Sequence, residues 1–144
     1  DNICMYKDID DKFIMEACKD SGLADFISEV SLDYVVGQNG AMLSGGQKQK
    51  IALARALVHN SPVIIFDEAT SNTDVYSEHQ INGLLHTKLK EKTVIIITHK
   101  QEILKEADQI IMLKDGAVVG SGVYDDLSKD NLEFKNLLNM GEKY

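Results

Sequence analysis

Two strand-length aliphatic segments, separated by a helical pattern, constrain the fold of this chain more than any other feature. Val63–Phe66 and Val94–Ile97 are wholly apolar, and residues 76–90 between them carry apolar side chains at helical spacing. Continuous apolar strands are typical of parallel sheets whose two faces are both covered. Strand, helix and strand in this order predict a right-handed βαβ unit and therefore an α/β fold.

Polar residues follow each of these strands. Asp67 and Glu68 follow the first, and His99 follows the second. Because open α/β sheets bind ligands beyond the carboxyl ends of their strands, these side chains are candidates for chemistry. One carboxylate suits Mg²⁺, the other suits a proton acceptor for an attacking water, and the imidazole suits a phosphate oxygen. A solvent-facing acidic pair and a structural histidine are the plainer alternatives.

Ser44 and Gln47 have the S-x-x-Q spacing of a capping box, which predicts a helix that begins at Ser44. Gly45 and Gly46 in its first turn are poor helix formers, at a cost of roughly 1 kcal/mol each against alanine. Bare backbone N–H groups at a helix start favour an anion, so close approach of a phosphate explains both glycines. An ordinary helix start is the alternative.

The chain changes character near Pro62. Before it we expect a helix from Asp10 or Asp11 to Gly22, with Phe13, Ile14, Ala17 and Cys18 on one face. We also expect a short amphipathic turn with helical spacing at residues 23–30, a loop at 32–42 and a helix at 44–59. After it we expect a short helix at 102–107, a strand at 109–113, a hairpin turn at Asp115-Gly116 and a final amphipathic helix around Phe134. This pattern predicts a helical part, 1–61, and a sheet-containing part, 62–144.

Composition excludes some classes of function. A net charge of −8 argues against a nucleic-acid partner, since nucleic-acid binders show basic patches. No apolar run approaches the ~18 residues that a membrane helix needs, so we expect a soluble chain.

The ordered motifs resemble those of ATP-binding cassette (ABC) transporter ATPases, and the flanking sequence is similar to the exporter branch. The signature motif, the Walker B strand, the D-loop and the H-loop of that family correspond to Leu43–Gln47, Val63–Glu68, Ser71–Asp74 and Thr98-His99. The resemblance covers essentially all 144 residues. It implies a partial P-loop NTPase fold: a helical signature subdomain plus the C-terminal half of the parallel-sheet core.

The resemblance also implies roles for single residues. Ser44, Gly45, Gly46 and Gln47 would contact the γ-phosphate of ATP held by a second nucleotide-binding domain in a head-to-tail dimer. Asp67 would support Mg²⁺ and Glu68 would be the general base. His99 would sense the γ-phosphate, and Asp74 would communicate across the dimer. Asn72 and Thr73 depart from the family's usual D-loop.

One family motif, the Gly-rich phosphate loop G-x-x-x-x-G-K-[S/T], is absent from these residues. Because that loop and its lysine are the main cradle of the β- and γ-phosphates, we expect the chain alone to hydrolyse essentially no ATP. The loop's strand lies between two of the predicted strands in the family. We therefore expect exposed strand edges and self-association, element exchange or local rearrangement.

The expected function is that of part of the ATPase domain of an exporter, at the cytoplasmic face of a membrane and in contact with transmembrane domains. One alternative is a soluble ABC ATPase that acts on DNA or ribosomes. Another is a non-enzymatic interaction module that completes a composite ATP site on a partner.

Overall fold

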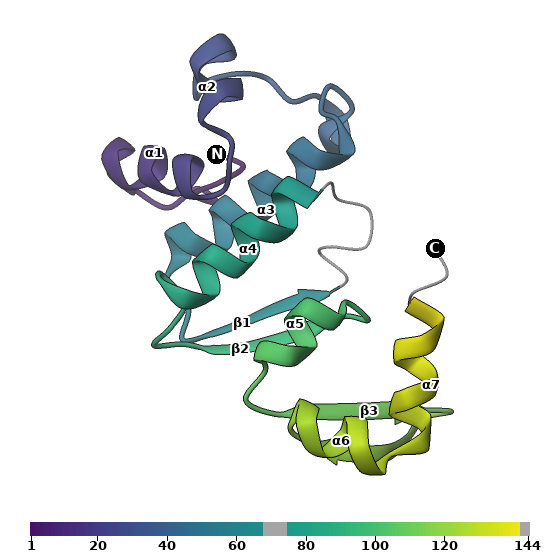
Figure 1. Ribbon diagram of the computed structural model, residues 1–144. Coiled ribbons are helices and arrows are strands. Elements are labelled where there is room, and N and C mark those ends of the chain that lie inside the picture. Colours follow the sequence, from purple (N-terminus) through teal and green to yellow (C-terminus); the bar gives the residue numbers. More distant parts are fainter. Residues whose placement is uncertain (68–74, 142–144) are drawn as a thin grey trace. The chain divides into compact units, whose positions relative to one another are not determined.

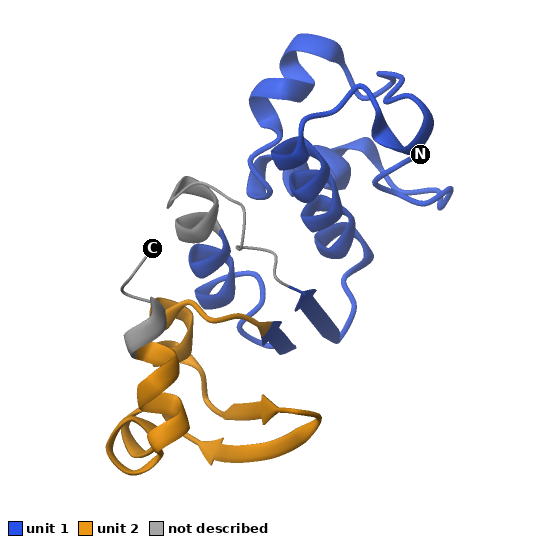
Figure 2. Ribbon diagram, turned by 90° about the vertical axis from the view of Figure 1, so that its right-hand side faces the viewer, with its two compact units in different colours: residues 1–96 blue, residues 97–144 orange. Residues whose placement is uncertain are grey.

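The computed structural model describes the backbone of residues 1–67 and 75–141 and the side chains of residues 1–67 and 81–138. Glu68 and Asp74 therefore lie outside the described residues. The chain forms two compact units, Asp1–Ile96 and Ile97–Tyr144, which are coloured separately in Figure 2. The predicted division into residues 1–61 and 62–144 is based on sequence pattern and does not coincide with the boundary between these two units. It therefore stays a prediction.

The first unit begins with helices, as its sequence pattern predicts (Figure 1). In chain order they are α1 (Asp11–Asp20), α2 (Ala24–Val30), the short 3₁₀ helix η1 (Gln38–Gly40) and α3 (Gly45–His59). The Asp10 side chain caps α1 by accepting a hydrogen bond from the Lys12 backbone N–H at 2.8 Å. Asn60 ends α3 in the left-handed conformation, with φ of 49°, which asparagine tolerates better than most residues.

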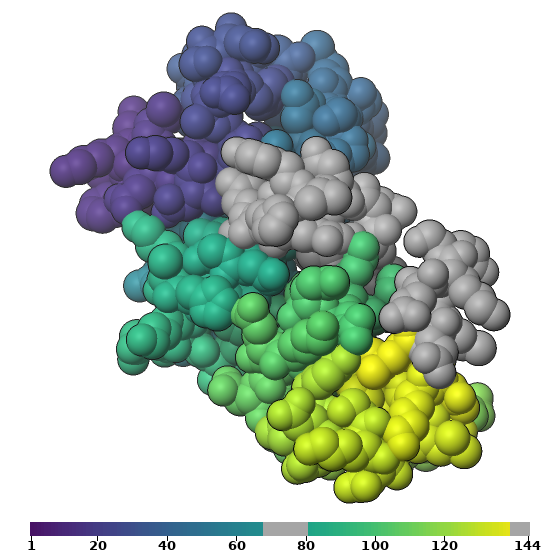
Figure 3. Space-filling view, viewed as in Figure 1, coloured from purple at the N-terminus to yellow at the C-terminus, as the bar shows by residue number. Residues whose placement is uncertain are grey.

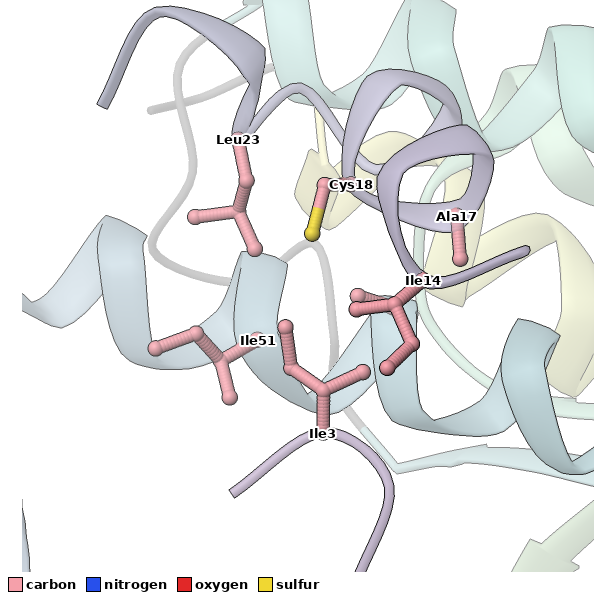
Figure 4. Packing of buried hydrophobic residues seen from close by; sticks show 7 residues of the cluster. Ile3, Ile14, Ala17, Cys18, Leu23 and Ile51 are labelled. Carbon is pink, nitrogen blue, oxygen red and sulfur yellow. The ribbon is translucent and has the colours of Figure 1, made fainter. Parts of the chain in front are cut away.

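The apolar face of α1 packs on α3 (Figure 4). The buried cluster consists of Ile3, Ile14, Ala17, Cys18, Leu23, Ile51 and Ala54. One expectation for α1 is wrong: the Phe13 side chain is 62% exposed. Ile14 lies three and four residues before Ala17 and Cys18, so these three side chains form the buried stripe. Phe13, which precedes Ile14 by one position around the helix, lies at the edge of that stripe.

The remainder of the first unit is a parallel βαβ unit, made of β1 (Val63–Asp67), α4 (Val75–His86) and β2 (Thr93–Ile97), whose last residue begins the second unit. The Thr93 N–H donates to the Pro62 carbonyl at 3.0 Å, which joins the start of β2 to the start of β1. The two strands therefore run in the same direction, as Figure 1 shows. Ile64, Phe66, Leu84 and Leu89 form the buried core of this part.

Helix α4 ends four residues earlier than the apolar pattern predicts. The Thr87 hydroxyl donates to the Gly83 carbonyl at 2.7 Å, and the Leu84 carbonyl accepts from the backbone N–H groups of Thr87 and Leu89. These bonds replace the regular helical pattern beyond His86. The resulting turn still buries Leu89, which is only 1% exposed.

Only one face of the β1–β2 sheet is covered by described residues, which corrects the expectation of two covered faces. Burial alternates along β1, and Val63 and Ile65 are 48% and 63% exposed. On β2, Ile95 and Ile97 are 48% and 52% exposed. In the part of the chain that the structure describes, the sheet has two strands, and its core cluster includes residues of α3 and of the α4 region.

The described residues of the second unit form an antiparallel hairpin and three helices. Its elements are α5 (Gln101–Glu106), β3 (Ile110–Lys114), β4 (Ala117–Gly122), α6 (Tyr124–Asp130) and α7 (Leu132–Gly141). Asp115 and Gly116 turn the hairpin with φ of 51° and 77°, the positive values that a type I′ turn requires. The hairpin turn is confirmed, whereas α6 was not predicted as a separate helix.

Helices α6 and α7 pack against each other, and both are visible on the surface in Figure 3. The buried core of this unit consists of Leu104, Ile110, Leu127 and Phe134. Phe134 is completely buried, in agreement with its predicted place on the apolar face of the last helix.

Candidate functional site

Helix α3 begins as the capping-box spacing predicts. The Gln47 N–H donates to Ser44 Oγ at 3.2 Å, and the Ser44 N–H donates to Gln47 Oε1 at 2.8 Å. Ser44 itself is extended, with φ of −67° and ψ of 162°. The reciprocal bonds fix the direction in which the first turn of α3 starts.

Gly45 and Gly46 leave the first turn of α3 open. A Cβ built on either residue meets nothing within 4 Å, and both residues are exposed. Helix geometry gives the amides of a first turn no intrahelical acceptor, and the capping box uses that of Gln47. The amides of Gly45 and Gly46 thus lie at the positive end of the helix dipole, where they suit an anion such as a phosphate.

A cavity of about 340 Å³ lies beside this helix, and Asn2, Gly40, Lys48 and Arg55 are among the residues that line it. The Arg55 Nε–H donates to the Asn2 carbonyl at 2.9 Å. Sequence reasoning missed this bond. No short-range pattern signals it, because the two residues are 53 positions apart.

Asp67 is the last residue of β1 and its side chain is exposed. A carboxylate at the carboxyl end of a strand in an open α/β unit provides the hard oxygen ligand that Mg²⁺ prefers. Among the side chains of residues 1–67 and 81–138, no three His, Cys, Asp or Glu gather into a group able to hold a metal ion. Glu68 and Asp74, predicted to act beside Asp67, fall outside the described residues.

His99 follows β2 by two residues and is exposed. It belongs to the second unit, whereas Ser44 to Gln47 and Asp67 belong to the first. The hydroxyl of Thr98 accepts a hydrogen bond from the Lys100 N–H at 3.0 Å, which closes a tight turn around His99. The described site residues therefore belong to two different units of the chain.

Known proteins with similar sequences indicate the family of this chain. A family described as ABC transporter matches residues 7–71. The alpha-hemolysin translocation ATP-binding protein HlyB of Proteus vulgaris is 46% identical over 119 residues, which are 81% of this chain and 17% of that protein. The chain belongs to the ABC transporter family.

Two further relatives extend the comparison across bacteria. The lactococcin-G-processing and transport ATP-binding protein LagD of Lactococcus lactis subsp. lactis is 45% identical over 128 residues, or 88% of this chain and 18% of that protein. An ATP-dependent lipid A-core flippase of Pseudomonas fluorescens is 41% identical over 130 residues, or 89% and 22%. This ABC transporter chain thus spans about a fifth of the length of these relatives.

A solved structure agrees with the family assignment. The structure of a bacterial Atm1-family ABC exporter with ATP bound matches 99% of this chain and 26% of that chain. The TM-score is 0.90 and the sequence identity is 31%. The helical part and the small sheets therefore have the fold of part of an ABC ATPase domain, as the motifs predict. In the described part of the chain, no helix is both long enough and apolar enough to cross a membrane.

Proposed function

We propose that this ABC transporter chain is the signature-bearing part of an exporter's ATPase domain, whose ATP hydrolysis drives transport across a membrane. The observation that carries the proposal is the start of α3, where a closed capping box presents two unobstructed glycines. The names of the relatives support it, since they describe ATP-binding proteins of translocation and transport and a flippase. The working location is the cytoplasmic face of the membrane, in contact with transmembrane domains.

The residues present fit ATP and Mg²⁺. The open space over Gly45 and Gly46 admits a phosphate to the backbone amides, and Ser44 and Gln47 hold those amides in place. The exposed Asp67 carboxylate is a suitable ligand for Mg²⁺ or for its water shell. When bound, Mg²⁺ neutralises charge on the phosphate oxygens.

Each residue then has a separate task. Ser44 to Gln47 bind the γ-phosphate of ATP that a second, head-to-tail ATPase domain holds. Glu68 accepts a proton from the attacking water and so acts as the general base. His99 donates to a γ-phosphate oxygen, and Asp74 links the two domains. Residues 1–61 supply the signature and residues 62–144 the catalytic carboxylates.

The test uses a longer polypeptide that carries a phosphate-loop segment ahead of residue 1. We expect MgATP turnover from this polypeptide and essentially none from residues 1–144 alone. Glu68→Gln in the longer polypeptide should lower turnover by about 10²–10⁴-fold while ATP binding persists, because only the proton acceptor is lost.

Steady-state phosphate release measures turnover, and equilibrium binding of labelled ATP provides the control. Undiminished turnover in Glu68→Gln overturns the role of Glu68. Tight MgATP binding by residues 1–144 alone overturns the proposal that the nucleotide needs a second domain.

A further inference from the structure

The turn that carries His99 is restrained at both ends within the second unit. On its N-terminal side, Thr98 Oγ1 accepts from the Lys100 N–H at 3.0 Å. On its C-terminal side, helix α5 begins at Gln101, only two residues after His99. The conformation of His99 therefore depends on where the first residue of α5 is held.

Gln101 is held by a residue from a distant part of the unit. Its Nε2 donates to the hydroxyl of Tyr124 at 2.6 Å, across 23 positions of sequence, in partly buried surroundings. Tyr124 is the first residue of α6. A partly buried hydrogen bond that joins two helix starts restrains the turn just before α5 more than an exposed contact does.

The Tyr124 ring is itself fixed by packing on two sides. Its ring meets that of Phe134 edge-on, with centroids 5.5 Å apart and an interplanar angle of 78°. Phe134 is completely buried, so it provides a rigid wall. The Lys105 ammonium lies 5.9 Å from the Tyr124 centroid, within the range of a cation–π contact. The Tyr124 hydroxyl is thus a preorganised partner for Gln101.

We propose that Tyr124 is a positioning residue for His99, which it orients through Gln101. This inference rests on the proposed function, in which His99 contacts the terminal phosphate of ATP. The hydroxyl of Tyr124 sets the position of Gln101, and Gln101 sets the end of the turn that presents the imidazole. Tyr124 does not contact the nucleotide in this arrangement, and its effect on turnover passes through His99.

Two variants remove the hydrogen bond from opposite ends. Tyr124→Phe deletes only the hydroxyl and keeps the ring that packs on Phe134. Gln101→Met keeps the length of the side chain and deletes the donor. Tyr34→Phe is the matched control, because Tyr34 makes a similar edge-on contact with Phe26 in the first unit, at 5.6 Å and 84°.

The first measurement uses the 144-residue chain and follows amide hydrogen exchange at Lys100 and Leu104 together with the NMR signals of the His99 ring. We expect exchange to accelerate roughly three- to tenfold in Tyr124→Phe and in Gln101→Met, as befits the loss of one hydrogen bond. The His99 ring signals should move toward those of an unrestrained histidine in both variants. The double variant should add nothing, since both changes delete the same bond. Unchanged exchange and ring signals, or additive effects, overturn the proposal.

The second measurement uses the longer polypeptide that hydrolyses ATP. Tyr124→Phe should lower kcat by about three- to tenfold with KM for ATP nearly constant, whereas Tyr34→Phe should leave both unchanged. If the NMR and exchange effects occur but kcat is unaffected, Tyr124 still positions His99 and the assigned role of His99 falls. A rise in KM with constant kcat contradicts positioning of a residue that acts during hydrolysis.

Discussion

At the scale of single residues, glycine in the first turn of α3 lowers the stability of the fold but leaves the backbone amides accessible to a phosphate. A Cβ at Gly46 would meet nothing within 4 Å, so Gly46→Ala should raise the free energy of unfolding by up to about 1 kcal/mol. The same methyl group stands beside the amides that suit a phosphate. In the longer polypeptide we expect ATP turnover to fall on the order of 10²-fold, as when one backbone donor to a transition state is lost.

Denaturant unfolding of the 144-residue chain and steady-state phosphate release measure these two effects of Gly46→Ala. A matched control is Gly83→Ala in α4, where an added Cβ also meets nothing within 4 Å. That change should stabilise the chain without lowering turnover. Equal losses of turnover in both variants would contradict a specific role for the α3 start.

Short-range residue interactions were predictable from the sequence, and long-range ones were not. The spacing of Ser44 and Gln47 determines their reciprocal bonds, because both partners lie within one helical turn. The bond from Arg55 to the Asn2 carbonyl joins residues 53 positions apart. The bond from Gln101 to Tyr124 depends in the same way on how α5 and α6 pack.

At the scale of elements, α1 is joined to the turn after α4 by an ion-pair cluster. The Lys88 ammonium binds the Glu16 carboxylate and lies 3.4 Å from an Asp20 carboxylate oxygen. The hydrogen bond and the charge of Lys88 lower the pKa of Glu16 below its usual 4.5. The hydrogen bond that Lys88 donates to Glu16, followed by the charge of Asp20, raises the pKa of Lys88 above 10.5.

The directions of these two pKa shifts determine how the stability of the fold changes with pH. A lowered carboxylate pKa stabilises the fold above pH 4.5, and that stability is lost as the pH falls through the lowered value. A raised ammonium pKa stabilises the fold below pH 10.5, and that stability is lost as the pH rises through the raised value. Because the Lys88 and Glu16 side chains are about half exposed, added salt should weaken the effect.

Lys88→Met should return the pKa of Glu16 toward 4.5, because it removes both the hydrogen bond and the charge that lower it. Titration of the Glu16 side-chain carboxyl signal by NMR measures the pKa. Lys90→Met, a similar change two residues away, should leave the Glu16 pKa as it is. A Glu16 pKa unaltered in Lys88→Met would show that the ion pair does not form in solution.

Most elements could be predicted from apolar periodicity, but their ends and pairings could not. The apolar pattern through Leu89 predicts a helix to residue 90. The Thr87 hydroxyl instead donates a hydrogen bond to the Gly83 carbonyl, and the chain turns there. Helix α6 was missed because its single buried residue, Leu127, gives no periodic signal. Propensity and pattern do not encode such local competition for hydrogen bonds.

At the scale of the whole molecule, the uncovered strand face should control association. Ile65 and Ile95 are 63% and 48% exposed on neighbouring strands, and exposed apolar surface on strands promotes pairing between chains. We expect the 144-residue chain to associate as its concentration rises. Ile65→Thr should reduce this association severalfold by light scattering, because it removes apolar surface yet suits a strand.

Phe13→Ser provides the comparison for Ile65→Thr, since Phe13 is equally exposed but lies on a helix. It should change association little. A chain that stays monomeric at all concentrations, or one that responds equally to both substitutions, would contradict association through the strands.

The motifs predicted the family, the fold class and the helix that bears the signature. They did not predict the geometry among Asp67, Glu68 and His99, because sequence spacing says which residues end each strand but not how far apart their side chains lie. That arrangement depends on the placement of β2, of the turn around His99 and of the residues that follow Asp67. The roles of these three residues therefore remain proposals to be tested by turnover.

The different burial of the two thiols in the first unit allows the local opening of its helices to be measured by thiol labelling. Cys18 is completely buried on α1, and burial raises its pKa, whereas Cys4 is half-buried. A thiol reagent should therefore modify Cys4 first and reach Cys18 only when α1 separates from α3. The labelling rate of Cys18, measured by mass spectrometry, would report how often α3, the helix that carries the signature, separates from α1.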